Sequence, residues 1–283
     1  MKKANIILLI GQSNAVGVGF TKYLPWHFDE KTVKKFYDGY ENVLINYRSH
    51  GIESNGFVKT RVNCTEAAKD TLGPEVGIAK NLSERYPNEQ FFIVKYAFGG
   101  SNLYNDWLSP SNGAPYHENA SADEIPDLLK AINSGVHPSA GWCYNGFIEL
   151  LRESIALLQK QGYEPKIRAL FWMQGESDSY STDLVEKYIG RYDNLLRDIQ
   201  ANFAPYLSNC VYVDAGISES WLYYKEINAE KAAYAKAKGY VYLDTIGAGL
   251  TTKNEPTDAP DTAHYDSDST VKLGELFAEN LVL

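Results

Sequence analysis

Residues 5–14 read Asn-Ile-Ile-Leu-Leu-Ile-Gly-Gln-Ser-Asn, an apolar run that leads directly into a short polar turn. A strand with one face in water alternates apolar and polar residues, whereas a strand buried on both faces is apolar throughout. The same continuous pattern recurs at residues 91–97, 167–173, 210–214 and 240–244. We therefore predict five buried strands, the first at 5–10, arranged as a parallel sheet.

Segments with apolar residues at a spacing of three to four lie between and after these strands. We predict helices at 75–85, 147–161, 182–203, 221–238 and 269–281. Strands that alternate with helices favour right-handed crossovers and a three-layer α/β/α sandwich. The sequence contains no repeat, linker or low-complexity segment, so we expect residues 1–283 to form a single domain.

Two long stretches, residues 14–74 and 98–142, have little regular pattern apart from a short strand expected at 42–46. Long irregular stretches in a compact domain are usually functional loops or disordered segments. Both begin at the carboxyl end of a predicted strand, which is where open α/β sheets bind ligands. We expect both to contribute to a substrate pocket.

The composition excludes several classes of function. A net charge of −9 without a cluster of Lys and Arg argues against nucleic acid as a partner. The three cysteines, Cys64, Cys143 and Cys210, are too few and too widely spaced for a disulfide framework or a metal site. No apolar stretch is long enough to cross a membrane. The run after Lys2 and Lys3 is short and lacks a small-residue cleavage site, so we expect a cytoplasmic location for the chain as given, or secretion if a signal peptide has been removed.

Ser13 lies in the polar turn after the first predicted strand. A serine hydroxyl becomes a useful nucleophile only when a base takes its proton and a third group orients that base. Taken alone, a serine between glutamine and asparagine is more often a turn residue or a helix cap. The interpretation of Ser13 as a nucleophile therefore depends on a partner elsewhere in the chain.

Asp261 and His264 provide this partner near the other end of the chain. An aspartate three residues before a histidine can fold back and accept the proton on Nδ1, which leaves Nε2 free to act as a base. None of the five histidines shows His-x-x-x-His spacing, so a zinc hydrolase is disfavoured. Ser13, His264 and Asp261 together favour a serine hydrolase.

Two further polar blocks follow predicted strands. In Phe-Gly-Gly-Ser-Asn at 98–102, the glycines let the backbone approach a ligand closely, and their N–H groups could donate to an oxyanion. Ser101 in this block is the rival nucleophile. In Trp-Met-Gln-Gly-Glu-Ser-Asp at 172–178, the amide of Gln174 could donate where negative charge develops.

In this order, the blocks resemble the SGNH hydrolase superfamily, and within it the carbohydrate esterase family 6 and sialate O-acetylesterase-like group, to which acetylxylan esterases are related. Gly-Gln-Ser-Asn at 11–14 is similar to the nucleophile block, residues 96–102 to the glycine block, and Asp-Thr-Ala-His at 261–264 to the Asp-x-x-His block. Gln-Gly-Glu at 174–176 is the most specific match, and Gly-Pro-Glu at 73–75 also resembles these proteins. The resemblance covers nearly the whole chain.

The resemblance implies a flavodoxin-like sandwich with a five-stranded parallel sheet, no metal and no organic cofactor. It implies a triad of Ser13, His264 and Asp261, and an oxyanion hole formed by the N–H groups of Ser13 and Gly100 and by the amide of Gln174. The wider superfamily has asparagine in a Gly-x-Asn-Asp pattern where this chain has Gln174. The sequence leaves open whether Gly99 or Gly100 is the donor. Candidates for substrate binding are Gln12, Asn14, Glu75, Asn102, Trp107 and Glu176, with Trp26 and Tyr104 as further aromatic side chains that could line a sugar site.

These residues predict a serine esterase that removes O-acetyl groups from a carbohydrate through an acetyl-enzyme. The expected partner is an acetylated sugar, such as acetylated xylan or a sialic acid. Two alternatives remain at this point. One is a lipase or thioesterase on the same catalytic frame, and the other is a carbohydrate-binding protein without catalysis. The sequence does not specify an oligomeric state.

Overall fold

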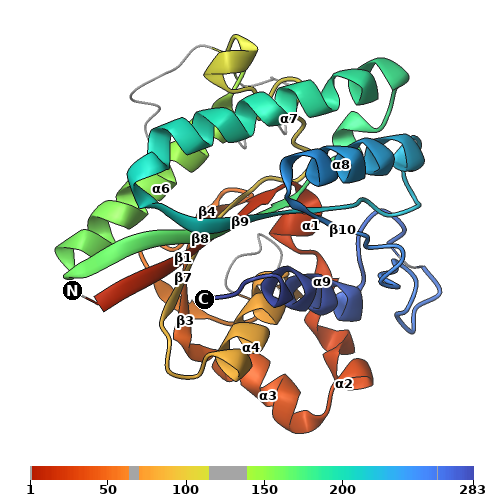
Figure 1. Cartoon of the computed structure of the whole chain (residues 1–283). Helices are drawn as coiled ribbons and strands as arrows, with labels where there is room; N and C mark the ends of the chain where they lie inside the picture. Colours follow the sequence, from red (N-terminus) through yellow and green to blue (C-terminus); the bar gives the residue numbers. More distant parts are fainter. Residues whose placement is uncertain (1, 64–69, 115–138, 260) are drawn as a thin grey trace.

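The computed structural model describes residues 2–63, 70–114, 139–259 and 261–283. Cys64 falls outside these residues, and Cys143 and Cys210 are free thiols. Helices cover both faces of a central sheet, so the fold has three layers (Figure 1). One face carries α6 (Trp142–Lys160), α7 (Thr182–Phe203) and α8 (Tyr224–Lys238), and the other carries α4 (Glu75–Arg85) and α9 (Ser267–Glu279).

Within the described residues the main sheet has eight strands rather than the predicted five. Their order is β10 (Val241–Leu243), β9 (Leu207–Ala215), β8 (Tyr163–Met173), β1 (Lys2–Gly11), β7 (Phe91–Ala97), β3 (Tyr40–Ser49) and β4 (Ile52–Glu53), with β5 (Val58–Thr60) also paired with β3. The pairs from β10 to β3 are parallel, whereas β4 and β5 run antiparallel to β3.

The predicted sheet had too few strands because β4 and β5 have only two and three residues, and because β3 does not show a continuous apolar pattern. Its buried polar residues include Asn46, which donates to the Ser154 hydroxyl at 2.9 Å, and Arg48, which pairs with Glu153 at 2.8 Å. These partners satisfy the polar groups in the folded chain, so the strand tolerates them. The sequence pattern alone led us to expect only a short strand at 42–46.

Residues 14–74 are also more regular than predicted. This stretch contains α1 (Ser13–Val16), α2 (Leu24–His27), α3 (Glu30–Asp38) and a two-stranded sheet of β2 (Gly19–Phe20) with β6 (Thr71–Leu72). The side chain of Asp29 caps α3 by accepting the Thr32 N–H. Short 3₁₀ turns occur at Thr21–Tyr23, Pro110–Asn112, Glu176–Asp178 and Ala204–Tyr206.

The register of the central strands brings their carboxyl ends to one level. Gly11 at the end of β1 pairs with Ala97 of β7 and with Met173 of β8, and Ser49 of β3 pairs with Ala97. After β1, the chain forms β3 and β7 on one side of β1, and then β8 on the other side. The loops after β1, β3, β7 and β8 therefore meet at the switch point of the sheet, where open α/β folds bind ligands.

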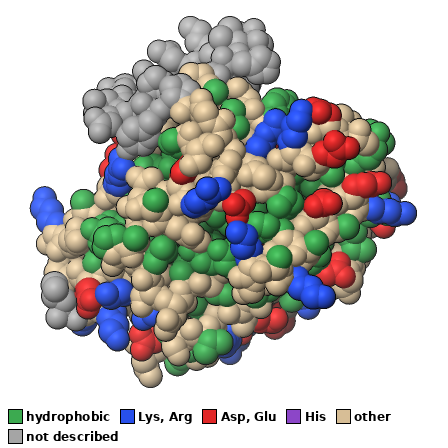
Figure 2. Space-filling model, turned by 45° about the horizontal axis from the view of Figure 1, so that its top comes forward, with side chains coloured by type: hydrophobic (Ala, Val, Ile, Leu, Met, Phe, Trp, Pro, Cys, Tyr) green, Lys and Arg blue, Asp and Glu red, His purple; other side chains and the backbone are tan. Residues whose placement is uncertain are grey.

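Two further findings concern surfaces. Among the helices of the described residues, none has an apolar segment long enough to span a bilayer. On the face shown in Figure 2, Lys and Arg side chains are interspersed with Asp and Glu. A surface that follows a phosphate backbone gathers basic side chains together instead.

Candidate active site

The nucleophile candidate Ser13 is placed by a tight junction between β1 and α1. Gly11 has φ +149°, and a Cβ atom there would lie 1.9 Å from the carbonyl oxygen of Met173, so only glycine fits. The N–H of Gln12 donates to that same oxygen at 2.9 Å. Ser13 begins α1 directly afterwards, so its N–H is one of the donors that a helix start leaves without an intrahelical acceptor.

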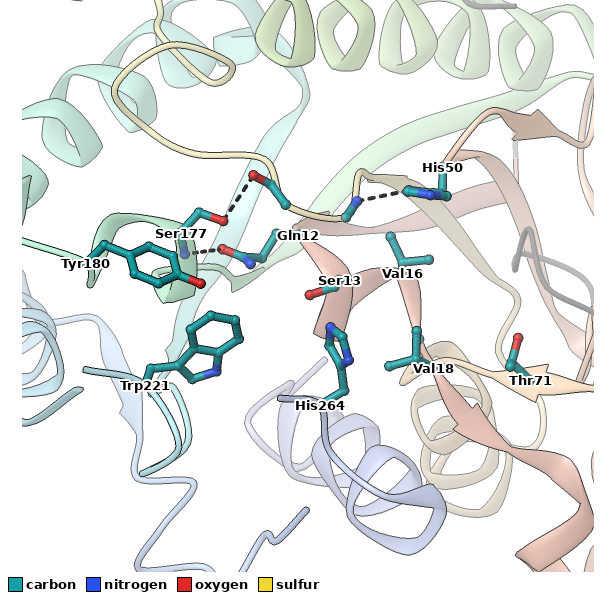
Figure 3. Close-up of a pocket in the computed structure, with 13 residues that line it drawn as sticks. Gln12, Ser13, Val16, Val18, His50, Thr71, Ser177, Tyr180, Trp221 and His264 are labelled. Carbon is teal, nitrogen blue, oxygen red and sulfur yellow. Dashed lines mark hydrogen bonds between the residues drawn. The ribbon is translucent and has the colours of Figure 1, made fainter. Parts of the chain in front are cut away.

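His264 and Asp261 form the hydrogen-bonded pair that the sequence predicts. Nδ1 of His264 lies 2.7 Å from Oδ2 of Asp261, and Oδ1 accepts the N–H groups of Ala263 at 2.8 Å and His264 at 3.3 Å. Partial burial acts to raise the pKa of Asp261, but the hydrogen bonds from His264 and the backbone outweigh it, so the pKa lies below its ordinary value. The ionised carboxylate favours a proton on Nδ1. Figure 3 shows the imidazole beside Ser13.

Asn14 joins the loop of the histidine to the loop after β8. Its Nδ2 donates to Oε1 of Glu176 at 2.7 Å, and its Oδ1 accepts the N–H of Tyr265 at 3.0 Å. Glu176 is fully buried, and this burial raises the pKa of its carboxyl despite the opposing hydrogen bond from Asn14. Both residues were candidates for substrate binding. The structure instead gives them contacts that position the neighbour of His264.

The glycine block separates the two possible donors. The N–H of Gly99 donates to Nδ1 of His50 at 3.2 Å, whereas the N–H of Gly100 has no acceptor among the described residues. The carbonyl of Gly100 accepts the hydroxyl of Ser177 at 3.0 Å. Gly100 therefore has the backbone N–H that is free to meet an oxyanion.

His50 is a site residue that the sequence analysis missed. It follows β3 directly, so the register carries it to the same sheet edge as Ser13 and Gly99. Burial lowers the pKa of His50 and so favours the neutral ring. Within that ring, the hydrogen bond from the Gly99 N–H identifies Nδ1 as the unprotonated nitrogen. A strand prediction extended from 46 to 49 would have placed this histidine at the site.

The contacts of Gln174 argue against its predicted role in the oxyanion hole. Its side chain is fully buried, and Nε2 donates to Oδ2 of Asp178 at 2.7 Å and to Oε1 of Gln12 at 3.1 Å, with the Ser101 carbonyl at 3.3 Å. Its Oε1 accepts the hydroxyl of Tyr188 at 2.9 Å. Both amide hydrogens thus have acceptors inside the protein.

The side-chain amide of Gln12, unlike that of Gln174, lies at the wall of the cavity. Its Oε1 accepts the N–H of Ser177 at 3.1 Å, the N–H of Gly175 at 3.4 Å and Nε2 of Gln174. Because three donors point at this atom, it is the oxygen of the amide, and the other atom is the nitrogen. Gln12 lines the central cavity, and its Nε2 has no acceptor among the described residues.

The other predicted residues lie away from the cavity. Ser101 is buried and its hydroxyl accepts the indole N–H of Trp107, itself fully buried, at 3.0 Å. Glu75 is fully buried in an ion pair with Lys95 at 2.7 Å. Asn102 uses its side-chain oxygen to accept the Asn105 N–H in a turn. The exposed side chains of Trp26 and Tyr104 are not part of the cavity wall.

A cavity of about 620 Å³ opens above Ser13 and His264. Its volume lies in the range typical of small-molecule sites, roughly 300–1,000 Å³. Among the described residues, no cluster of His, Cys, Asp and Glu is suited to hold a metal ion. The lining residues are Gln12, Ser13, Val16, Gly17, Val18, His50, Thr71, Gly99, Gly100, Ser177, Tyr180, Trp221 and His264 (Figure 3).

Comparison with known families decides the class of this site. A family model described as carbohydrate esterase, sialic acid-specific acetylesterase, matches residues 3–282. The chain belongs to this family of carbohydrate esterases. It is therefore a carboxylic ester hydrolase, as the sequence blocks predicted.

Solved structures similar to this esterase share its fold at low sequence identity. A protein from Arabidopsis thaliana is 19% identical, with a TM-score of 0.61 and 100% of both chains covered. NanS is 16% identical, with a TM-score of 0.59 over 98% of this chain and 96% of its own. A carbohydrate acetylesterase from Xanthomonas citri is 15% identical, with a TM-score of 0.54 over 97% of this chain and 55% of its own. No curated protein sequence matches the chain.

Proposed function

We propose that this esterase removes O-acetyl groups from a carbohydrate, with Ser13 as nucleophile, His264 as base and Asp261 as the group that orients the base. The observation that carries the proposal is the His264–Asp261 hydrogen bond of 2.7 Å at the wall of the cavity that also contains Ser13. The family match supports acetylated sugars as the substrate class, and so does the similarity to the carbohydrate acetylesterase from Xanthomonas citri.

The proposed reaction has two steps. His264 Nε2 takes the proton of Ser13 as the hydroxyl oxygen attacks the acetyl carbonyl, and the same proton then leaves with the sugar alcohol. Water next attacks the acetyl-enzyme, with His264 again as base, and releases acetate and free Ser13. Asp261 stabilises the imidazolium that forms in each step.

The oxyanion hole of the proposed mechanism combines the N–H groups of Ser13 and Gly100 with the Nε2 amide of Gln12. Each of these three donors lies on a residue of the cavity wall, and no protein acceptor in the described part of the chain occupies them. Donors that are already oriented stabilise developing negative charge without reorganisation during the reaction. Gln174 supports this arrangement from behind by holding the oxygen of Gln12.

We also propose that the chain adopts the SGNH hydrolase variant of the flavodoxin-like sandwich and works as one catalytic domain. The positions of the first strand and the last helix support a single domain. The N-terminal strand β1 lies in the middle of the sheet, and the C-terminal helix α9 packs against α4. The reaction needs no cofactor, since every proposed step uses side chains and backbone groups of the chain itself.

The test is a pair of serine substitutions. Ser13→Ala should abolish acetate release from p-nitrophenyl acetate and from acetylated xylan or O-acetylated sialic acid, while Ser101→Ala should keep most activity. Thermal unfolding of both variants controls for folding. An active Ser13→Ala variant together with an inactive but folded Ser101→Ala variant would reverse the assignment.

A further inference from the structure

The cavity has two chemically different ends on either side of Ser13. In Figure 3, the side chains of Val16, Val18 and Thr71 lie on one side, with His50 above them. The aromatic rings of Tyr180 and Trp221 lie on the other side, together with Ser177. The hydroxyl of Ser13 is drawn pointing toward this aromatic end.

The two rings form a defined pair. Their centroids are 5.8 Å apart with an interplanar angle of 87°, an edge-to-face contact. The backbone also links their segments, since the N–H of Tyr223 donates to the carbonyl of Ser179 at 3.1 Å. Tyr180 follows the turn after β8, and Trp221 lies between β9 and α8, so the pair bridges two neighbouring loops of the active-site edge.

The exposed surface of these two rings indicates that a ligand packs against them. The Tyr180 side chain is 59% exposed although it lies at the wall of a cavity, and Trp221 is only partly buried. Large aromatic side chains usually bury most of their surface, whereas exposed rings beside a reactive group are typical of ligand sites. The core aromatics Trp107 and Trp172, by contrast, are fully buried against one another.

We propose that Tyr180 and Trp221 form the subsite for the pyranose ring of the acetylated sugar, an inference that rests on the proposed function. The C–H faces of a pyranose pack against an aromatic ring, and the Ser177 hydroxyl on the same side can hydrogen-bond a sugar hydroxyl. At the opposite end, Val16 and Val18 have neither a flat face nor a polar group for a sugar. Thr71 is buried, and the His50 ring packs against Phe98 and accepts the Gly99 N–H.

The experiment removes each ring and compares two acetyl esters that differ in the alcohol. Trp221→Ala, Tyr180→Ala and the double variant are assayed on acetylated xylose and on ethyl acetate, which has no ring. Trp221→Phe and Tyr180→Phe keep a ring, and Leu222→Ala is the matched control because Leu222 is 66% exposed and is not part of the cavity wall.

Loss of one ring should raise KM for acetylated xylose roughly tenfold, the effect of about 1.4 kcal/mol of lost contact. The value of kcat/KM for ethyl acetate should stay near that of the wild type. The phenylalanine variants should recover most of the affinity, and Leu222→Ala should behave as wild type on both esters.

Two results would overturn the subsite. One is an unchanged KM for the sugar ester in the double variant, and the other is an equal loss on both esters, which would indicate a structural role. Failure of the wild-type enzyme to deacetylate any sugar, with activity kept on ethyl acetate, would instead refute the carbohydrate substrate itself. The wild-type measurement therefore separates the two claims.

Discussion

Replacing Gln12 with glutamate tests the oxyanion hole, because it separates the roles of the oxygen and the nitrogen of the Gln12 side chain. The oxygen of Gln12 accepts hydrogen bonds from the N–H groups of Gly175 and Ser177 and from Gln174. A glutamate oxygen can accept all three, and these donors favour its ionised form. The substitution therefore keeps the buried network, removes the donor that faces the cavity and places a negative charge beside the oxyanion.

The lost donor sets the smallest expected effect, and repulsion between the new carboxylate and the oxyanion lowers kcat further. Deleting one oxyanion donor lowers kcat by about 10²–10³, or roughly 3–4 kcal/mol, and leaves KM nearly unchanged because the contact forms in the transition state. Gln12→Ala should behave differently. It leaves three N–H donors without an acceptor at about 1–3 kcal/mol each, so it should also lower the free energy of unfolding by about 3 kcal/mol or more.

The assay is steady-state hydrolysis of p-nitrophenyl acetate, with chemical unfolding of each variant. Gln159→Glu on the exposed side of α6 adds the same charge far from the site and should keep wild-type kcat. A Gln12→Glu enzyme with wild-type kcat would remove Gln12 from the oxyanion hole. A Gln174→Ala enzyme that lost the same factor in kcat without losing stability would restore the role predicted for Gln174.

Four other substitutions have defined outcomes. His264→Ala should lower kcat as severely as Ser13→Ala, because the two groups act as a unit. Asp261→Asn should lower kcat by a factor roughly ten to a hundred times smaller. Steady-state kinetics of the three variants checks this ranking. Burial raises the pKa of Asp178 to about 6. Between about pH 4 and pH 6, this carboxyl therefore keeps its proton in the folded chain but has lost it in the unfolded chain. This term makes the wild type less stable as the pH rises through that window. Asp178→Asn lacks the term, so its stability relative to the wild type should increase by roughly 3 kcal/mol from pH 4 to pH 7 in urea unfolding; an unchanged difference would contradict it. Gly11→Ala should fail to fold or lose activity, because its Cβ would lie 1.9 Å from the Met173 carbonyl oxygen, and circular dichroism would detect the loss.

Local patterns in the sequence predicted most of the framework. The helices expected at 75–85 and 182–203 match α4 and α7 in their bounds. The second of these has a clear local signal, since the Ser181 side chain caps it by accepting the Leu184 N–H. The strand β3 was predicted only over 42–46, because its buried polar residues find partners on α6 and β4, which are far away or weakly marked in the sequence. Missing its last residues also hid His50.

The sequence by itself determined which reactive groups the chain carries and that Ser13, Gly100 and Gln174 follow buried strands, because continuous apolar runs and the turns after them are local features. It also placed Asp261 three residues before His264, close enough for their hydrogen bond to form. Only the tertiary structure decided which amide faces the cavity, because the orientation of Gln12 depends on donors more than 160 residues away. Likewise, composition cannot distinguish Trp107 from Trp221. The first packs between Tyr96 and Trp172 in the core, and the second lies at the cavity wall, a difference set by long-range packing alone.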